Sequence, residues 1–319
     1  MRALVSTYGT AIAGLIVIFF FAVASPVFAT PGNIALILKE TSFLAILAIG
    51  FAIALTTGEL DLSIAEVASL SAVLCGLLVH TGYPPALAIS VGLLTGLACG
   101  LWNGLAVTVL HVPSLIATLG TAAIARGFGF MVTQGVAFVG RWPASFTEVA
   151  RGTLLGIPNL VWFLTLIAGA SYFLLNWTRT GAHLVATGEA TEASRLAGIS
   201  TGRMKLAGLV LCGGFAGVTA VFLTSSLSSA APNMAGDHFL YAIAAVLLGM
   251  TMFVPGRPNI AGTLVAALLL KALGNGLVLI GAAYYVQDIV LGLIIIGSVA
   301  LSTSTFSRTT LIRSLSFKT

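Results

Sequence analysis

The residues that could carry chemistry in this chain are concentrated in one polar stretch. Residues 179–205 read RTGAHLVATGEATEASRLAGISTGRMK, and the whole chain has only 14 Lys and Arg and 9 Asp and Glu. Six of these charged residues fall inside the stretch: Arg179, Glu189, Glu192, Arg195, Arg203 and Lys205. The sequence on both sides is strongly apolar. Such a stretch is either a solvated loop or a docking site for another protein.

A second set of ionisable residues lies in or beside the apolar runs. Its members are Glu59, Asp61, Glu66, Arg126, Asp237, Lys271 and Asp288. Ionisable groups inside a membrane are typical of proton-coupled and ion-coupled carriers. Most of this set lies near the ends of the runs, where a charge can reach the interface, and Lys271, the deepest, can snorkel or pair. An ion-coupled carrier of a small polar solute therefore stays open as the alternative function.

The familiar signatures of ATP hydrolysis and metal catalysis are missing from the sequence. The four lysines follow Leu38, Met204, Leu270 and Phe317, so no Gly-Lys step and no Walker A loop exists. The four histidines form no His-Glu-x-x-His site, and the three cysteines have no metal-type spacing. We therefore expect no catalytic residue, no metal and no cofactor bound by this chain.

Composition places the chain in a membrane. It is 58% hydrophobic and 7% charged, against about 25% charged residues in soluble domains. Its apolar runs are long and apolar all round, which predicts helices rather than the alternating strands of a barrel. We expect an all-α integral membrane protein, one membrane domain over residues 1–319, with about ten transmembrane helices. The predicted spans are 10–28, 42–57, 64–80, 86–109, 114–133, 158–177, 204–224, 238–254, 260–280 and 285–303.

The first run leaves two alternatives open. Residues 11–24 followed by Val27-Phe28-Ala29 could form a signal peptide with a small-residue cleavage site. Only Arg2 supplies its basic region, and the run is long, which favours a retained first span. Residues 1–29 are therefore interpreted as a span, with the cleaved signal as the alternative.

The basic residues predict the topology. If both termini are cytoplasmic, nine basic residues lie inside and three outside, which fits the positive-inside rule. The inside set is Arg2, Arg179, Arg195, Arg203, Lys205, Arg257, Arg308, Arg313 and Lys318, and the outside set is Lys39, Arg141 and Arg151. This topology places residues 179–203 in the cytoplasm and the loop 135–157 outside.

The cytoplasmic stretch predicts a short docking helix. On a helix over 189–197, Ala190, Ala193, Ser194 and Ala197 share one face. Small side chains there would let another surface approach the backbone, and Gly198 would end the helix. So short a helix is not stable alone in water. It docks either on the membrane bundle of this chain or on a partner.

Polar groups elsewhere suggest a path and an outer contact. Amides and hydroxyls suit the passage of a neutral solute, although they also form interhelical hydrogen bonds. The residues that could line the path are Asn103, Thr118, Asn275 and Gln287. In the outer loop, Arg141, Glu148 and Arg151 could meet a binding protein, while Trp142 could anchor at the interface. The sequence Ser63-Ile-Ala-Glu66 has the spacing of a capping box, which predicts that Ser63 caps the next helix.

Residues 186–199 resemble the cytoplasmic coupling segment of a known transporter family. That family's pattern reads A-x-G-G-N-x-E-A-A-R-L-S-G-I. The matching residues are Ala186, Gly188, Glu192, Ala193, Arg195, Leu196, Gly198 and Ile199. Glu189, Ala190, Ser194 and Ala197 depart from the pattern. The family is that of permease subunits of ATP-binding-cassette sugar importers, the ribose-type branch of the branched-chain amino acid and ribose permeases.

Three further stretches resemble the same family. Residues 103–127 follow its pattern N-G-L … V-P-x-x-I-x-T-L-G-T-x-x-I-A-R-G. Residues 57–63 are similar to T-G-G-I-D-L-S, with Glu59 in place of a glycine. Ala242–Val246 is similar to A-I-A-A-V without the preceding aspartate, and residues 254–259 carry two prolines in place of a glycine-rich loop.

The resemblance implies a fold, a mechanism and a set of partners. Two permease subunits, identical or different, would form a path for a monosaccharide across the bacterial inner membrane. A cytoplasmic ATPase would bind ATP and Mg, and a periplasmic or lipid-anchored binding protein would deliver the sugar. The ATPase would contact the coupling segment, which consists of Gly188, Glu189, Ala190, Glu192, Ala193, Arg195, Leu196, Ala197, Gly198 and Ile199.

Overall fold

The computed structural model describes the backbone of residues 2–316 and the side chains of residues 10–300. Four of the basic residues used to predict the topology, Arg2, Arg308, Arg313 and Lys318, lie outside the described side chains. Across this part of the chain the structure is helical, with short two-residue strand pairs in its loops.

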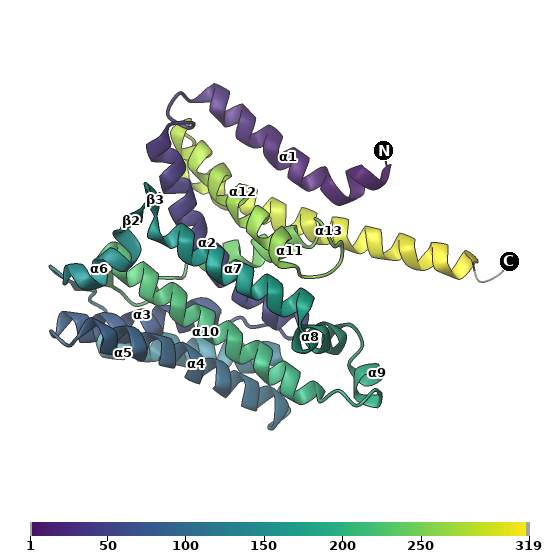
Figure 1. Ribbon diagram of the computed structural model, residues 1–319, viewed down its shortest axis with the longest axis horizontal. Helices are drawn as coiled ribbons and strands as arrows, with labels where there is room; N and C mark the ends of the chain where they lie inside the picture. Colours follow the sequence, from purple (N-terminus) through teal and green to yellow (C-terminus); the bar gives the residue numbers. More distant parts are fainter. Residues whose placement is uncertain (1, 317–319) are drawn as a thin grey trace. The chain divides into compact units, whose positions relative to one another are not determined.

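All ten predicted spans form helices (Figure 1). They are α1 (Arg2–Ala24), α2 (Pro31–Thr56), α3 (Ile64–His80), α4 (Pro85–Thr108), α5 (Ser114–Thr133), α7 (Asn159–Trp177), α10 (Thr201–Leu227), α11 (His238–Gly249), α12 (Ile260–Leu279) and α13 (Tyr284–Ser316). Within the described residues, six helices are long and apolar enough to cross a membrane, and shorter apolar helices lie in α1, α3, α11 and α13. The chain is therefore a multi-pass, all-α membrane protein.

The remaining elements belong to loops. α6 (Ala144–Arg151) lies in the predicted outer loop, and α8 (Arg179–Glu189) and α9 (Thr191–Leu196) form the polar stretch. Strand β1 (Phe138–Val139) pairs with β4 (Ser229–Ala230), and β2 (Thr153–Leu154) pairs with β3 (Ile157–Pro158), both antiparallel.

Some helix ends differ from the prediction. The helix α2 begins at Pro31, well before the predicted start at residue 42, because a proline is favourable at the first helical position. The helix α11 ends at Gly249 rather than at residue 254. The following segment is irregular, with Phe253 at φ 59° and Gly256 at φ 85°, and Pro255 and Pro258 cannot continue a helix.

The described chain falls into two compact units, one of residues 1–41 with 240–319 and one of residues 42–239. In the first unit, α1 packs on α12, where Phe21 lies so close to Gly276 that a side chain at that glycine would overlap its ring. Lys271 does not stay unpaired. Its ammonium lies 3.6 Å from Glu40 and 5.3 Å from the centre of the Tyr241 ring.

In the second unit, α10 packs most extensively on α4, and it also contacts α3, α6 and α8. Four glycines on α4, at positions 92, 96, 100 and 104, are buried against α10. A Cβ atom at Gly96 would overlap the backbone at Gly213 and Gly217. These glycines let the two helices approach closely, as small residues do in membrane helix pairs.

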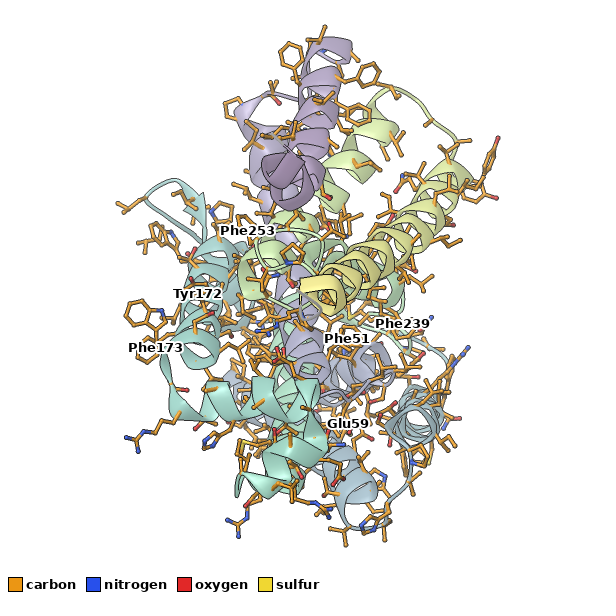
Figure 2. All side chains as sticks on the ribbon, turned by 90° about the vertical axis from the view of Figure 1, so that its right-hand side faces the viewer. Phe51, Glu59, Tyr172, Phe173, Phe239 and Phe253 are labelled. Atoms are coloured by element: carbon orange, nitrogen blue, oxygen red, sulfur yellow. The ribbon has the colours of Figure 1, made fainter. Side chains whose placement is uncertain are left out.

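The second unit carries large apolar side chains on its outside. Phe51 is 1% exposed, whereas Tyr172 and Phe173 on α7 point away from the bundle (Figure 2). On the same helix Trp177 is 74% exposed. Such apolar surface is rare in water-soluble monomers, and lipid is the solvent that covers it in a membrane protein.

Candidate functional site

The polar stretch forms two short helices that meet at Ala190. The prediction of one helix over 189–197 was wrong, because α8 runs to Glu189 and Ala190 adopts φ −154° and ψ 76°. α9 then begins at Thr191, and its Ser194 amide bonds the Ala190 carbonyl at 2.9 Å. A turn of backbone at Ala190 therefore reorients α9 relative to α8.

Most of the predicted coupling residues are exposed. Glu189, Ala190, Glu192, Ala193, Arg195, Ala197 and Gly198 face solvent, and Leu196 is 86% exposed. The small residues do not form one common face, because Ser194 is buried and its hydroxyl donates to the Ala186 carbonyl at 2.8 Å. Glu192 and Arg195 form an ion pair of 2.7 Å on the protein surface, where such a pair contributes little stability.

Gly198 ends α9, as predicted. It adopts φ 84°, and its amide bonds the Arg195 carbonyl while the Ile199 amide bonds the Ser194 carbonyl. This pair of bonds is a Schellman motif, which requires a left-handed residue and so favours glycine.

Residues 198–202 also have the spacing Gly-x-Ser-x-Gly, but here Ser200 joins two helices. A hydrolase elbow needs a strand before the serine, so this spacing carries no catalytic meaning.

The end of α8 rests on the loop that follows α2, residues 57–63. A Cβ atom at Gly188 would overlap the Thr56 carbonyl oxygen and lie 2.9 Å from the Gly58 amide nitrogen. Gly58 itself adopts φ 85°. Only glycine at position 188 allows this backbone-to-backbone contact, which joins the candidate coupling segment to the 57–63 loop.

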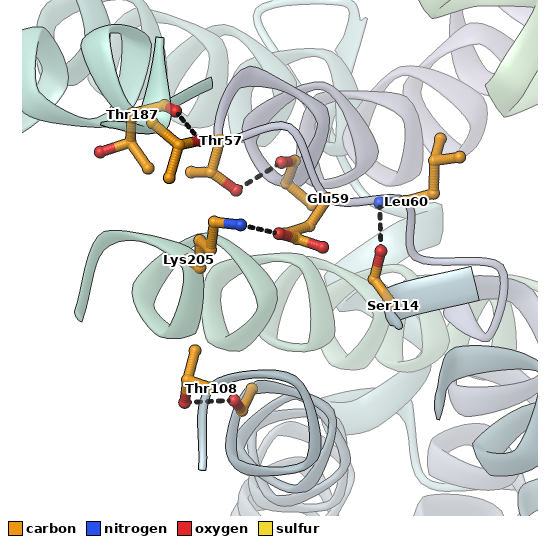
Figure 3. Close-up of polar contacts among 10 residues, drawn as sticks. Thr57, Glu59, Leu60, Thr108, Ser114, Thr187 and Lys205 are labelled. Atoms are coloured by element: carbon orange, nitrogen blue, oxygen red, sulfur yellow. Dashed lines mark hydrogen bonds and ion pairs between the residues drawn. The ribbon is translucent and has the colours of Figure 1, made fainter. Parts of the chain in front are cut away.

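An ion pair fixes the same loop to α10. Lys205, in the first turns of α10, places its Nζ 2.6 Å from Glu59 Oε1 (Figure 3). The Glu59 side chain is 8% exposed and the Lys205 side chain 26%. Sequence reasoning noted both charges separately but missed their pairing, because nothing local links residues so far apart along the chain.

A buried polar cluster forms the other side of the 57–63 loop. Asp61 Oδ1 accepts bonds from the Ser63 amide at 2.9 Å and the Ser63 hydroxyl at 2.5 Å. Asn103 donates to Ser63 Oγ at 2.8 Å and contacts Asp61 Oδ2 at 3.5 Å. Burial raises the pKa of the Asp61 carboxyl above its usual range, and the hydrogen bonds from Ser63, Cys212 and Asn103 oppose that rise.

The expected capping box is absent at this position. Ser63 is the residue before α3, but its side chain makes no capping bond to the helix and instead donates to Asp61. The reason is its backbone, which has the helical angles φ −87° and ψ −12° rather than the extended angles of a cap.

Thr118 ties the loop to α5. Its hydroxyl bonds the Leu60 carbonyl at 3.2 Å and accepts from the Leu62 amide at 3.1 Å, while Ser114 accepts from the Leu60 amide at 3.4 Å. The loop thus contacts α4, α5, α8 and α10 within one unit. Asn103 and Thr118 are both fully buried in these contacts, and their role in a solute path stays a prediction.

The other two predicted path residues lie in the first unit. Asn275 and Asn33 exchange two amide hydrogen bonds of 2.9 Å each. Gln287 is half-buried on α13. A Cβ atom at Gly274 would lie 3.4 Å from its Oε1.

The loop over residues 135–157, which is predicted to lie outside, is a folded cap rather than an open loop. Trp142 is not at an exposed interface position, because it is buried against Phe146 with ring centres 5.7 Å apart. The Ser225 hydroxyl on α10 bonds the Phe146 carbonyl at 2.7 Å, and Arg151 Nε bonds the Ser226 carbonyl at 2.7 Å. Arg141, Glu148 and Arg151 remain exposed on this cap.

Comparison with known proteins identifies the family of the chain. A family described as "Branched-chain amino acid transport system / permease component" matches residues 33–299. The ribose import permease protein RbsC of Escherichia coli (strain K12) is 34% identical over 292 residues, or 89% of this chain and 90% of the relative. RbsC of Bacillus subtilis (strain 168) is 33% identical over 90% of this chain and 89% of its own.

A relative with a different printed solute is similar over much of its length. The autoinducer 2 import system permease protein LsrC of Salmonella choleraesuis is 29% identical over 83% of this chain and 76% of the relative. No solved structure matches the chain. The match of the family over most of the sequence, together with the ten apolar helices, leads to one conclusion: the chain belongs to the permease components of the branched-chain amino acid transport family.

Proposed function

We propose that this chain is the membrane permease subunit of an ATP-binding-cassette importer for a monosaccharide or a related sugar-like solute. Relatives that align with about nine tenths of the chain are named as ribose import permeases, which supports a sugar. The LsrC relative supports a wider class of small polar solutes. The chain itself is a transport subunit and no enzyme, and ATP with Mg binds to a separate ATPase.

The observation that carries this proposal is the exposed α9 and its link to the interior. Leu196 projects almost entirely into solvent from a helix too short to be stable without support. Behind it, Gly188 rests on the 57–63 loop, and Lys205 and Glu59 fix that loop to α10. A partner that binds α9 can therefore move a loop that contacts α4 and α5 through Asn103 and Thr118.

The opposite end of α7 supplies a second docking surface. The 19 residues of α7 span about 28 Å, close to the thickness of a bilayer core, and they separate α8 from the folded cap. We propose that Arg141, Glu148 and Arg151 on this cap meet a periplasmic or lipid-anchored sugar-binding protein. A second permease subunit completes the path in the bacterial inner membrane, and both termini are cytoplasmic.

The test is co-purification of the ATPase encoded nearest to this gene with the full chain. Leu196→Glu should abolish the interaction, because it places a charge in the centre of the proposed contact. Leu155→Glu is the matched control, since Leu155 is equally exposed at 85% but lies in the outer cap between β2 and β3. Neither leucine supports the fold, so both variants should purify in wild-type yield.

The proposal predicts that wild type and Leu155→Glu retain the ATPase and that Leu196→Glu loses it. If wild type retains no ATPase, or Leu196→Glu retains as much as the control, α9 is not the coupling site. In the first case, uptake driven by an ion gradient becomes the leading function.

A further inference from the structure

A pocket between α3 and α5 brings two opposite charges and an aromatic ring together. Its volume is about 490 Å³, within the usual range for small-molecule sites. It is lined by Glu66, Ala122, Ala123, Arg126, Gly127 and Phe130. Except for Glu66, all of these residues belong to α5. The space around Gly127 is open, because a Cβ atom at that glycine would have no atom within 4 Å.

The charged groups in this pocket have unused hydrogen-bonding capacity. Glu66 Oε2 is buried and has no hydrogen-bond partner within the described part of the chain. A buried polar atom without a partner is costly and rare in native proteins. The Arg126 guanidinium lies 5.9 Å from the centre of the Phe130 ring, a distance at which the ring holds the cation by a cation–π interaction.

Ionisable side chains on membrane helices mark functional sites by default, because lipid solvates them poorly. The pocket therefore calls for a ligand that satisfies a carboxylate and a guanidinium at once. An anion would be attracted by Arg126 but repelled by Glu66. A cation would be attracted by Glu66 but repelled by Arg126. A neutral molecule with many hydroxyl groups donates to the carboxylate, accepts from the guanidinium, and packs its C–H groups on the apolar wall.

We propose that the pocket formed by Glu66, Arg126 and Phe130 is a binding site for a neutral polyhydroxylated solute, a sugar or polyol, on its way through the permease. This inference rests on the proposed transport of a sugar-like solute and assigns that solute a site. Glu66 accepts hydrogen bonds from its hydroxyl groups, Arg126 donates to its oxygens, and Phe130 holds Arg126 in place.

The test measures protection of a thiol placed in the pocket. Ala123→Cys is introduced into the full chain with Cys99→Ser, because Cys75 and Cys212 are buried and Cys99 is only half-buried. The purified protein in lipid nanodiscs is labelled with N-ethylmaleimide in the presence of D-ribose, D-xylose, D-glucose, D-galactose or ribitol. Inorganic phosphate and phosphatidylglycerol vesicles serve as probes for an anionic headgroup. Uptake of the same five solutes by the complete importer is measured separately.

We expect at least one solute that the importer takes up to protect Cys at position 123. Glu66→Gln or Arg126→Gln should weaken that protection about ten-fold, as expected for the loss of one charge-assisted hydrogen bond. Glu66→Gln should also allow protection by the anion D-ribonate, which a merely structural role of Glu66 would not produce. Phe130→Ala should weaken protection, whereas Phe130→Trp, which keeps an aromatic ring, should protect about as well as Phe130.

Two matched controls lie on the same helix. Gly127→Leu should fill the pocket and abolish protection, whereas Gly120→Leu should not, because Gly120 is equally open but does not line the pocket. Phe128→Ala should leave protection unchanged, since Phe128 is exposed like Phe130 but lines a different pocket with Trp102 and Cys99.

The remaining outcomes separate the pocket from the proposed function. If no solute that the importer takes up gives protection, or if protection in Glu66→Gln and Arg126→Gln equals that in the wild-type pocket, the pocket assignment is overturned while sugar import stands. If phosphate or the anionic vesicles protect and the sugars do not, the site belongs to a lipid headgroup and the proposal fails. If the importer takes up none of the five solutes, sugar import is overturned and the pocket assignment with it.

Discussion

At the scale of single residues, the most informative side chains are those that hold the 57–63 loop. Glu59 and Asp61 are nearly buried carboxyl groups in one short segment, and each has its own partners. Lys205 pairs with Glu59 at one end. At the other end Ser63 donates to Asp61 and accepts from Asn103. These bonds connect the loop to the neighbouring helices, and the loop lies beside the proposed ATPase contact.

Removing Lys205 should destabilise the protein more than removing a neighbouring charge. Lys205→Gln leaves the Glu59 carboxylate buried without its partner, which we expect to cost about 3 kcal/mol, the lower end for buried pairs because Lys205 is partly exposed. Arg203→Gln is the control, since Arg203 is exposed near the same end of α10. The midpoint temperature of thermal unfolding in detergent measures the stability of both variants. A second change, Glu59→Gln, should recover most of the loss, and failure to recover it would show that the pair is not coupled.

The Ser63 hydroxyl should matter far more than a similar hydroxyl on the helix that follows it. Ser63→Ala removes a donor to Asp61 and an acceptor for Asn103, which should cost about 2 kcal/mol. Ser71→Ala on α3 should be neutral or stabilising, because Ser71 is equally buried and its hydroxyl has no partner among the described residues. Equal losses of thermal stability in the two variants would contradict the assigned bonds.

At the scale of elements, the ten helices could be predicted because each is a long run of apolar residues, and a membrane requires such runs to satisfy their backbone internally. The four glycines on α4, at positions 92, 96, 100 and 104, follow one another at intervals of four residues, and the structure packs them on α10. The break at Ala190 could not be predicted from periodicity, since it depends on the backbone angles of one residue. The apolar run over 238–254 likewise gave no sign that α11 ends at Gly249, before the irregular segment with Pro255 and Pro258. The pairing of Glu59 with Lys205 depends on tertiary packing, which no local pattern encodes.

The contact between α8 and the 57–63 loop should be sensitive to one methyl group. Gly188→Ala places a Cβ atom on the Thr56 carbonyl, and we expect the overlap to cost about 1–3 kcal/mol and to weaken ATP-driven uptake. Gly202→Ala is the matched control, because this exposed glycine in the first turn of α10 has no atom within 4 Å of a Cβ position. Its stability should stay level or rise, since alanine favours a helix. If Gly188→Ala takes up solute as fast as the control, the contact between α8 and the 57–63 loop does not couple the ATPase to transport.

At the scale of the whole molecule, the proposal requires the two docking surfaces to face opposite sides of the membrane. Glu192→Cys on α9 and Glu148→Cys on the cap both replace exposed residues. In intact bacterial cells, a membrane-impermeant maleimide should label Cys at position 148 and leave Cys at position 192 unlabelled until the membrane is opened. Labelling of both sites, or only of position 192, in intact cells would overturn the predicted topology.

The most direct measurement of the central claim is solute uptake into proteoliposomes that contain this chain, the neighbouring ATPase and the binding protein. The account predicts uptake of a monosaccharide or polyol only when ATP and Mg are present on the ATPase side. It also predicts that Leu196→Glu abolishes this uptake while Gly202→Ala retains it. Uptake that follows an imposed ion gradient without ATP, or that is equal in the two variants, would contradict an importer driven through α9.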